Sequence, residues 1–260
     1  MTTAVLAAEQ FEPPSAPDFW QPLVGDGAFA LTRPMILMVL SVIVLAVVMM
    51  AVTKRLSVVP GRGQYRAEGV YGLVRNSIAR DVIGQEHFKP YLPLLFTLFT
   101  LILLNNLFGI IPVLQYPTMS RIGFPLALAL AVYVVYLVAG VRRRGATGFV
   151  KSLVPPGLPW WVVPIVFILE VVTFLITRPV TLTLRLFGNM FAGHILLLLF
   201  ALGGEFLLLH GDGIIKVVSI PAFLMFFLFT AFEILIAFLQ AYVFILLASV
   251  YIAEIYSDAH

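Results

Sequence analysis

The sequence contains no cysteine and few charged residues. Of its 260 residues, 11% are Asp, Glu, Lys or Arg, whereas soluble domains average about 25%. The absence of cysteine excludes disulfides and thiolate metal sites. A glycine-rich phosphate loop, an HExxH motif and a GxSxG motif are also missing. We expect no cofactor, no bound metal and no nucleic-acid partner.

What the chain has instead is long apolar runs. Hydrophobic residues make up 61% of the sequence, and the mean hydropathy is +1.04. Several runs are long enough to span a bilayer. This composition predicts a single membrane domain over residues 1–260. The predicted fold class is an all-α integral membrane protein with about five crossing helices and one interfacial amphipathic helix.

The first part of the chain is predicted to contain a tail, one crossing helix and a basic loop. Residues 1–32 indicate an acidic, mostly irregular tail, and residues 35–52 indicate the first crossing. Residues 54–89 carry seven Lys and Arg side chains. The positive-inside rule places this loop in the cytoplasm and the N-terminus outside.

Within the basic loop an apolar residue recurs every four positions, at Val70, Val74, Ile78 and Val82. This pattern favours a basic amphipathic helix that lies on the membrane surface. The alternative is an ordinary cytoplasmic loop.

Two further crossings are predicted at residues 91–114 and 122–141. The first contains Asn105 and Asn106, and paired asparagines inside a span are expected to hydrogen-bond a neighbouring helix. The second ends at the basic cluster Arg142 to Arg144, which is again expected in the cytoplasm.

Two longer apolar stretches follow, at residues 158–202 and 214–257. At 1.5 Å per residue each runs roughly 60 Å, about twice the hydrocarbon core of a bilayer. Each is therefore either two crossings or one tilted helix. Between Ile176 and Asn189 of the first stretch, Pro179 and Gly188 are the only turn-forming residues, and membrane helices tolerate both. We favour two long, strongly tilted helices in an antiparallel hairpin, with the C-terminus in the cytoplasm.

The first long stretch places a permanent charge at membrane depth. An arginine at the bilayer centre costs about 2.5–3.5 kcal/mol on insertion scales, and Arg185 cannot lose its charge by deprotonation. An anion must therefore meet it. Arg178, Arg185 and Asn189 follow at steps of seven and four, which places them on one helix face. The alternative is a structural arginine paired with a carboxylate of the same chain.

The two long helices share a register of polar groups. In an antiparallel hairpin, His194 and Glu233 fit nearly the same register as Arg185 and Gln240. A histidine and a glutamate together can exchange protons near neutral pH. His194 and Glu233 would therefore serve an outer aqueous inlet, while Arg185 and Gln240 lie in the middle of the membrane.

The same register places Glu170 and Glu254 at the cytoplasmic end of the hairpin. These two carboxylates are candidates for an inner outlet. A continuous water path would dissipate about 2.3 kcal/mol per proton for each 100 mV across the membrane. Arg185 would block such a leak because it repels a bare proton.

At these residues the sequence resembles a known family. The string Pro179 to His194, PVTLTLRLFGNMFAGH, closely resembles the signature of subunit a of F-type ATP synthases, and LLNNLFGIIP resembles another segment of that family. The resemblance covers about residues 85–257. It implies the stator half of a proton channel set against a rotating ring of c subunits, with Arg185 as the family's essential arginine.

The individual residues match the family pattern unevenly. Arg185, Asn189 and Gln240 match it directly. His194 and Glu233 match members with histidine at the first position and glutamate at the second; other members have the two exchanged. Glu170 lies one residue further from the Arg178–Pro179 step than in many members.

The resemblance also implies partners and a location. The partners would be the c-subunit ring, the peripheral-stalk b subunits, the rest of the ATP synthase complex and the lipid bilayer. The chain would be a non-catalytic, multi-pass subunit of the bacterial plasma membrane. Two other hypotheses are a secondary transporter whose Arg185 binds an anionic substrate, and a purely structural membrane scaffold.

Overall fold

The computed structural model describes residues 11, 13–15, 22–25, 31–54, 56–111, 116–154 and 157–256. These residues are predominantly helical, which confirms the predicted all-α fold class. The acidic residues of the predicted tail and the last four residues of the chain lie outside the described part. Ahead of the first helix, β1 (Pro22–Val24) and β2 (Leu31–Thr32) form a small antiparallel ribbon.

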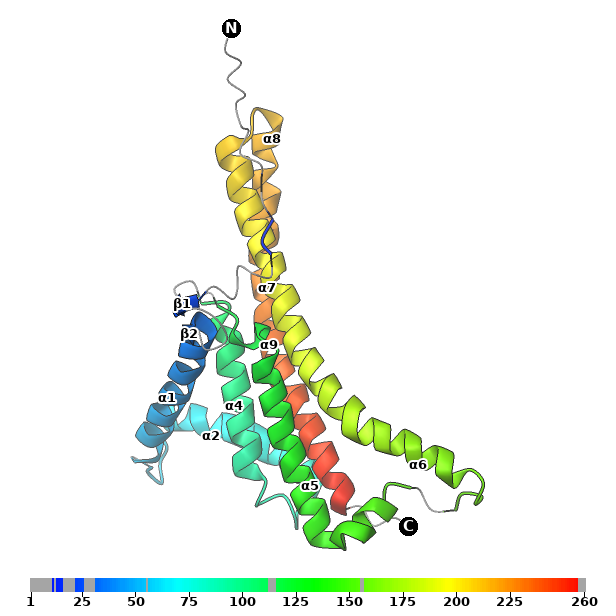
Figure 1. Cartoon of the computed structure of the whole chain (residues 1–260). Coiled ribbons are helices and arrows are strands. Elements are labelled where there is room, and N and C mark those ends of the chain that lie inside the picture. Colours follow the sequence, from blue (N-terminus) through cyan, green and yellow to red (C-terminus); the bar gives the residue numbers. More distant parts are fainter. Residues whose placement is uncertain are drawn as a thin grey trace.

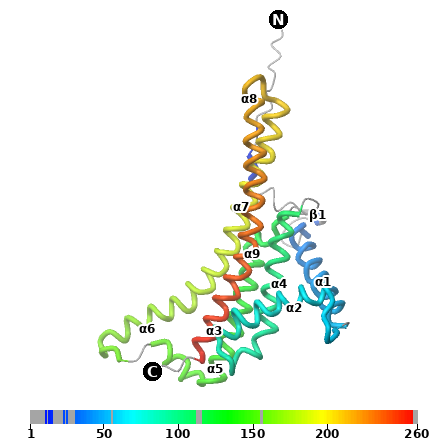
Figure 2. The backbone as a smooth tube through the Cα atoms, turned by 180° about the vertical axis from the view of Figure 1, so that it is seen from behind, coloured from blue at the N-terminus to red at the C-terminus, as the bar shows by residue number. Residues whose placement is uncertain are grey.

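Four helical segments among the described residues are long and apolar enough to cross a membrane. They are α1 (Arg33–Thr53), α5 (Gly123–Lys151) and two long segments, Val163–His210 and Ile214–Tyr256. The helix α4 (Leu92–Phe108) is apolar but shorter. Figures 1 and 2 show α4, α5 and α9 side by side, with α1 on the outside of α4.

The helix α4 ends at Phe108, six residues before the predicted boundary. The backbone tightens there, because Gly109 N donates to Asn106 O at 3.2 Å, and Pro112 lies just beyond, in a segment outside the described residues. The 17 residues of α4 span about 26 Å at 1.5 Å per residue. This is slightly less than a hydrocarbon core of about 30 Å.

The paired asparagines of α4 bond to two different helices, which confirms the expectation for them. Asn105 Nδ2 donates to Ser41 Oγ of α1 at 2.9 Å, and Thr118 Oγ1 donates to Asn105 Oδ1 at 2.8 Å. Asn106 Nδ2 donates to the backbone oxygen of Ala237 at 3.4 Å. Because both asparagines are fully buried, these bonds fix α4 between its neighbours.

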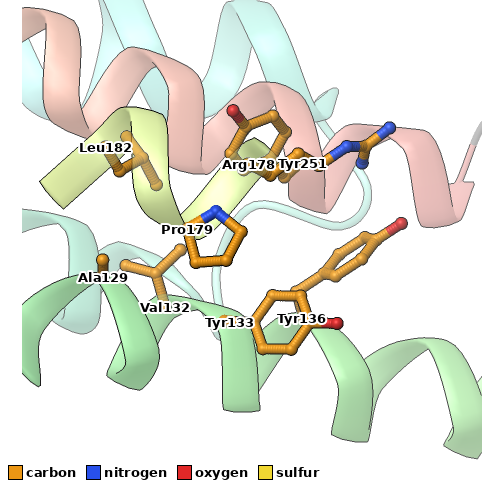
Figure 3. Close-up of a pocket in the computed structure, with 8 residues that line it drawn as sticks. All are labelled: Ala129, Val132, Tyr133, Tyr136, Arg178, Pro179, Leu182 and Tyr251. Carbon is orange, nitrogen blue, oxygen red and sulfur yellow. The ribbon is translucent and has the colours of Figure 1, made fainter. Parts of the chain in front are cut away.

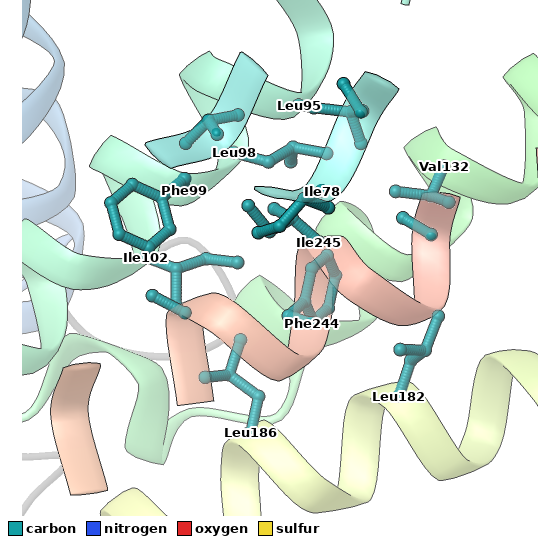
Figure 4. Packing of buried hydrophobic residues seen from close by; sticks show 14 of the residues in the cluster. Ile78, Leu95, Leu98, Phe99, Ile102, Val132, Leu182, Leu186, Phe244 and Ile245 are labelled. Carbon is teal, nitrogen blue, oxygen red and sulfur yellow. The ribbon is translucent and has the colours of Figure 1, made fainter. Parts of the chain in front are cut away.

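The basic loop forms α2 (Arg62–Val74), the π-helix η2 (Arg75–Arg80) and the short α3 (Asp81–Ile83). The predicted helical pattern is confirmed, and the middle of its apolar face packs on protein. Val74 and Ile78 are 0% exposed. Figure 4 shows Ile78 among Leu95, Leu98 and Ile245, which belong to α4 and α9.

The core lies where α4, α9, η2 and α7 meet. Its largest side chains include Phe99 and Ile102 from α4 and Leu186 from α7 (Figure 4). The face that α7 buries follows helical spacing through Leu182, Leu186 and Met190. This packing holds the middle of the hairpin against the rest of the molecule.

The helix α5 continues beyond Val141, its predicted end, and then folds back. It bends at Gly145, whose φ of 71° is unfavourable for residues with a Cβ. The fold-back lays the Phe149 ring on Gly140, where a Cβ would have no room. We call residues 145–153 the α5 hook; it lies at the end of the molecule where the described chain ends (Figure 1). The 3-10 turn η3 (Thr118–Ser120) precedes α5.

The two long segments are single helices packed antiparallel. The first is α6 (Val163–Val172), the π-helix η4 (Thr173–Thr177) and α7 (Arg178–His210); the second is α8 (Ile214–Val217) and α9 (Ser219–Tyr256). At 48 and 43 residues, each exceeds the length needed to cross a bilayer directly. Each stretch is therefore one long helix, as predicted, and not two separate crossings.

The connector of the hairpin is shorter than predicted. The helix α7 continues through Gly203 and Gly204 to His210. At Gly204 a Cβ would lie 3.4 Å from Ala222 Cβ, so this glycine serves close helix packing instead of a turn. In Figures 1 and 2 this end of the hairpin extends beyond α1, α4 and α5, while α6 diverges from the bundle at the other end.

The end of α9 is tied to two other parts of the chain. The Tyr256 ring stacks on His87 at 4.1 Å between centroids, and its hydroxyl lies 2.9 Å from that of Tyr91. The guanidinium of Arg143 lies 4.4 Å from the Tyr256 ring centroid. The predicted basic loop and the basic cluster of α5 therefore meet at the same end of the molecule.

Candidate functional site

Arg185 lies on α7 in the middle of the hairpin and is half-buried. Within the described residues no carboxylate lies within ion-pair distance of Arg185. The structure therefore gives no support to the alternative of an arginine neutralised by its own chain. Among the described residues, no ion pair neutralises its permanent positive charge.

Asn189 and Gln240 differ in how deeply they are buried. Asn189, one turn after Arg185 on α7, is half-buried. Gln240 on α9 is 8% exposed and is followed by Ala241, which is 0% exposed. The small side chain of Ala241 suits the close approach of α9 to its neighbours.

His194 and Glu233 are buried on the two facing helices. Each is 4% exposed. The Glu233 carboxylate lies directly against Gly193, since a Cβ added to this glycine would be 3.0 Å from Glu233 Oε1. Glu233 thus lies level with Gly193, the residue before His194, close to the predicted register. Because glycine has no side chain, the Glu233 carboxylate has room there.

Glu170 and Glu254 line one cavity. It lies at the end of the hairpin that is predicted to face the cytoplasm. The cavity has a volume of about 80 Å³. Arg178 joins the two carboxylates in its wall, and α5 contributes Tyr136 and Arg144. The site thus brings together residues from α5, α6, α7 and α9, which are far apart in the sequence.

The direct partner of Glu254 is Arg178. Arg178 NH1 donates to Glu254 Oε2 at 2.5 Å, and the Arg178 side chain is 18% exposed. The register predicted from residue numbers placed Glu254 level with Glu170 instead. Side chains lean toward the N-terminus of their helix. In an antiparallel pair, two long side chains therefore meet across positions that the backbone register does not align.

Aromatic rings surround the Arg178 guanidinium. It lies 5.0 Å from the ring centroid of Tyr251, 5.9 Å from that of Phe174 and 6.0 Å from that of Tyr136. Figure 3 shows Arg178 and Pro179 between Tyr251 of α9 and the tyrosines of α5. A guanidinium within about 6 Å of a ring face is attracted to it, so this arginine is held on several sides.

The sequence pattern does not predict this role of Arg178. Helical spacing places the residue on the face of Arg185 and assigns no partner to it. A signal was present, because Tyr251 and Glu254 lie three residues apart on one face of α9. No group of His, Asp and Glu side chains that could hold a metal ion occurs in the described part of the chain.

These features define the class of protein first: a polytopic α-helical membrane protein with ionisable side chains along a two-helix hairpin. The comparisons with known proteins then give the family. A family model described as "ATP synthase A chain" matches residues 35–253. The chain belongs to this family.

Similar curated proteins cover almost the whole chain. A protein named ATP synthase subunit a from Nocardioides sp. is 44% identical over 262 residues, covering 96% of this chain and 95% of the relative. Proteins of the same name from Pseudarthrobacter chlorophenolicus and Rhodococcus erythropolis are each 37% identical. They match 96% and 100% of this chain, and 96% of their own lengths. The family assignment therefore extends beyond the arginine motif.

Proposed function

We propose that this protein is the stator proton-channel subunit of the ATP synthase membrane sector. The observation that carries the proposal is Arg185, a permanent charge on a long apolar hairpin with no ion-pair partner among the described residues. In a rotary motor the partner would be the carboxylate of each passing c subunit. Proton flow past Arg185 would then drive rotation and ATP synthesis, while catalysis would belong to the soluble sector.

Two separate groups of residues serve the two sides of the membrane in this proposal. His194 and Glu233 form the outer inlet, where an imidazole and a carboxyl group pass protons between water and the ring. Glu170 and Glu254 lie at the inner outlet. Asn189 and Gln240 accompany Arg185 between them. Supporting this division, the inner carboxylates share a cavity, whereas the outer pair is buried further along the hairpin.

Arg185 has two effects in this arrangement. It favours the ionised form of an arriving c-subunit carboxyl group, which promotes release of the carried proton. It also repels a bare proton, so protons cross only on the ring. Each 100 mV across the membrane is worth about 2.3 kcal/mol per proton, which this barrier preserves.

The partners follow from the same role. They are the c-subunit ring, the peripheral-stalk b subunits and the remainder of the complex. The basic loop after α1 and the basic cluster of α5 favour the cytoplasm for that end of the molecule. We infer a multi-pass protein of the bacterial plasma membrane, with the N-terminus outside and the C-terminus in the cytoplasm.

The test is replacement of Arg185 with Ala in the assembled complex. We expect ATP-driven proton pumping in inverted vesicles to be abolished, while the complex is recovered in normal amount. Arg121→Ala is the matched control, because Arg121 donates to Thr32 Oγ1 at 2.7 Å and belongs to neither helix of the hairpin.

Pumping at the wild-type rate by Arg185→Ala vesicles would contradict the proposal. Co-purification provides an independent check. A stator subunit is isolated with a small, very apolar, multi-copy subunit. A secondary transporter acts alone and moves an anionic solute.

A further inference from the structure

The two carboxylates of the inner cavity have unequal surroundings. Glu254 is bonded to Arg178 at 2.5 Å. Glu170 lines the same cavity, is half-buried, and forms no ion pair with a described residue. A cavity with one bound and one unbound carboxylate suggests that the two acids do different work.

The ion pair between Arg178 and Glu254 is more buried and more closely surrounded on the arginine side. The Arg178 side chain is 18% exposed, whereas that of Glu254 is 40% exposed. Tyr251, Phe174 and Tyr136 surround the guanidinium at 5.0 to 6.0 Å. These rings come from α9, η4 and α5, so the arginine connects three helical segments at the start of α7.

The cavity is bounded by the α5 hook. Phe149, Ser152 and Leu153 of the hook line it. Arg144, just before the hook, donates to the backbone oxygen of Ile255 at 3.1 Å. The fold-back at Gly145 therefore forms one wall, and the end of α9 forms another. Glu170 of α6 also lines this cavity. In the sequence Glu170 precedes Arg178, whereas Arg185 follows it.

We propose that Arg178 is a positioning residue of the inner outlet: it fixes Glu254 as a structural anion and leaves Glu170 as the carboxylate that relays protons. The inference rests on the proposed function, because it assigns roles within the same proton path. It separates two residues that the sequence placed in one group.

The physical reason is that a relay must gain and lose a proton repeatedly. If Glu254 took up a proton, its pair with Arg178 would be lost, because a guanidinium stays charged. Arg178 would then be a largely buried charge without a counterion, which is strongly unfavourable. Glu170 has no such constraint. It can change protonation state without breaking an ion pair within the described structure.

The decisive experiment removes both charges of the ion pair together. Passive proton conductance is measured in membranes that contain the complete membrane sector and are stripped of the soluble sector. Arg178→Gln and Glu254→Gln are each expected to lower conductance about tenfold, because each leaves one charge unpaired. In the double variant, two amides can hydrogen-bond in place of the ion pair, and conductance is expected within about threefold of wild type.

Glu170→Gln provides the contrast. We expect it to lower conductance by about 100-fold, the scale of a lost acid–base group, both alone and in the double-variant background. Arg121→Gln, which removes an arginine at the other end of the bundle, is expected to leave conductance unchanged. The amount of subunit in the purified complex is measured for every variant.

A second variant addresses incomplete assembly. The exchange Arg178→Glu with Glu254→Arg keeps an ion pair between α7 and α9 but moves the carboxylate to the other helix. Conductance within about threefold of wild type is expected, because the pair is preserved. Conductance lower than this in an assembled exchange variant would overturn the inference.

The outcomes distinguish this inference from the proposed function. An inactive Arg178→Gln/Glu254→Gln complex together with an active Glu170→Gln complex would overturn the assignment of roles while leaving the proton channel intact. Normal pumping by Arg185→Ala would instead overturn the proposed function. The result that would overturn the assignment of roles to Glu170 and Glu254 is thus different from the result that would overturn the proposed function.

Discussion

The α7–α9 hairpin holds a carboxylate in opposite ways at two of its levels. Near the middle of both helices, Glu233 is 4% exposed and lies against the bare backbone of Gly193. At the end where α7 begins and α9 ends, Glu254 is 40% exposed at its side chain and is bound by Arg178. The first site depends on close helix packing, whereas the second depends on two long side chains that reach each other.

The comparison also separates the two arginines of α7. Arg178 and Arg185 lie seven residues apart on the same face, yet only Arg178 has an ion-pair partner among the described residues. In the functions proposed above, the paired arginine positions a carboxylate and the unpaired one meets a partner's charge. Both residues are arginines on one helix face, so residue type and spacing alone do not separate them; the ion pair does.

The prediction with the largest expected effect concerns which end of the hairpin faces outside. An epitope tag inserted after Val59, which is 83% exposed, should be shielded in intact cells and reachable in inverted vesicles. The reason is the basic character of the surrounding loop. Immunolabelling measures this as an all-or-none difference.

Labelling of that tag from outside intact cells would show that the predicted orientation in the membrane is inverted. The end with His194 and Glu233 would then face the cytoplasm, and the inlet and the outlet would exchange. Labelling of the same tag in permeabilised cells, where the antibody reaches both faces of the membrane, is the control for accessibility of the epitope.

A second prediction tests whether His194 and Glu233 act as one unit. His194→Ala and Glu233→Ala should each lower passive proton conductance by at least about 100-fold. The double variant should be little worse than either, because coupled residues are not additive. The exchange His194→Glu with Glu233→His should recover part of the loss, since it restores one acid and one imidazole.

These variants are compared at matched amounts of assembled subunit. Independent, multiplicative losses without recovery in the exchange variant would show that the two residues act separately. The shared register of α7 and α9 would then carry no functional meaning.

A smaller effect is expected at Gly193. In Gly193→Ala the new Cβ would lie 3.0 Å from Glu233 Oε1, so the carboxylate must shift by a few tenths of an ångström. We expect conductance to fall about tenfold, because small displacements of reacting groups are costly. An alanine in a helix is otherwise about 1 kcal/mol more favourable than glycine, so reduced stability is not the expected cause.

Gly203→Ala is the matched control on the same helix. Its new Cβ would meet Phe11 at 3.8 Å, an ordinary contact distance. Equal conductance of the two alanine variants would show that the contact between Gly193 and Glu233 has no part in proton transfer.

The smallest effect is expected away from both ends of the hairpin, in the hydrogen bonds of Asn105. Thr118→Val removes the 2.8 Å bond to Asn105 Oδ1. Side-chain hydrogen bonds in membrane proteins contribute about 0.6 kcal/mol on average. We expect a slightly lower unfolding temperature of the detergent-solubilised complex with unchanged conductance. A large loss of conductance would connect this network to the proton path.

Sequence patterns predicted the fold where long-range packing has little influence. Apolar length was enough for α1, because a span of about 20 residues has few alternatives. The boundaries were less accurate. The helix α4 ends at Phe108 and α7 continues to His210, because glycine permits either a turn or close packing. Gly109 lies in a turn, whereas Gly204 packs against Ala222.

The apolar repeat of the basic loop shows the same limit. Its period predicts a helix, but a period does not show whether lipid or protein covers the apolar face. Ile78 is 0% exposed because α4 and α9 lie over it, and these helices are distant in the sequence. The membrane-surface position therefore stays a prediction, whereas the contact of this face with α4 and α9 is observed.

By itself, the sequence determined the membrane class, the permanent charge of Arg185 and the approximate register of His194 with Glu233. Composition, the chemistry of a guanidinium and helical periodicity are local properties, so no coordinates were needed for them. Only the tertiary structure decided that Arg178 has an ion-pair partner and that Glu170 shares a cavity with Glu254. Ion pairs form between side-chain tips, and their positions depend on how the helices lean, bend and pack against one another.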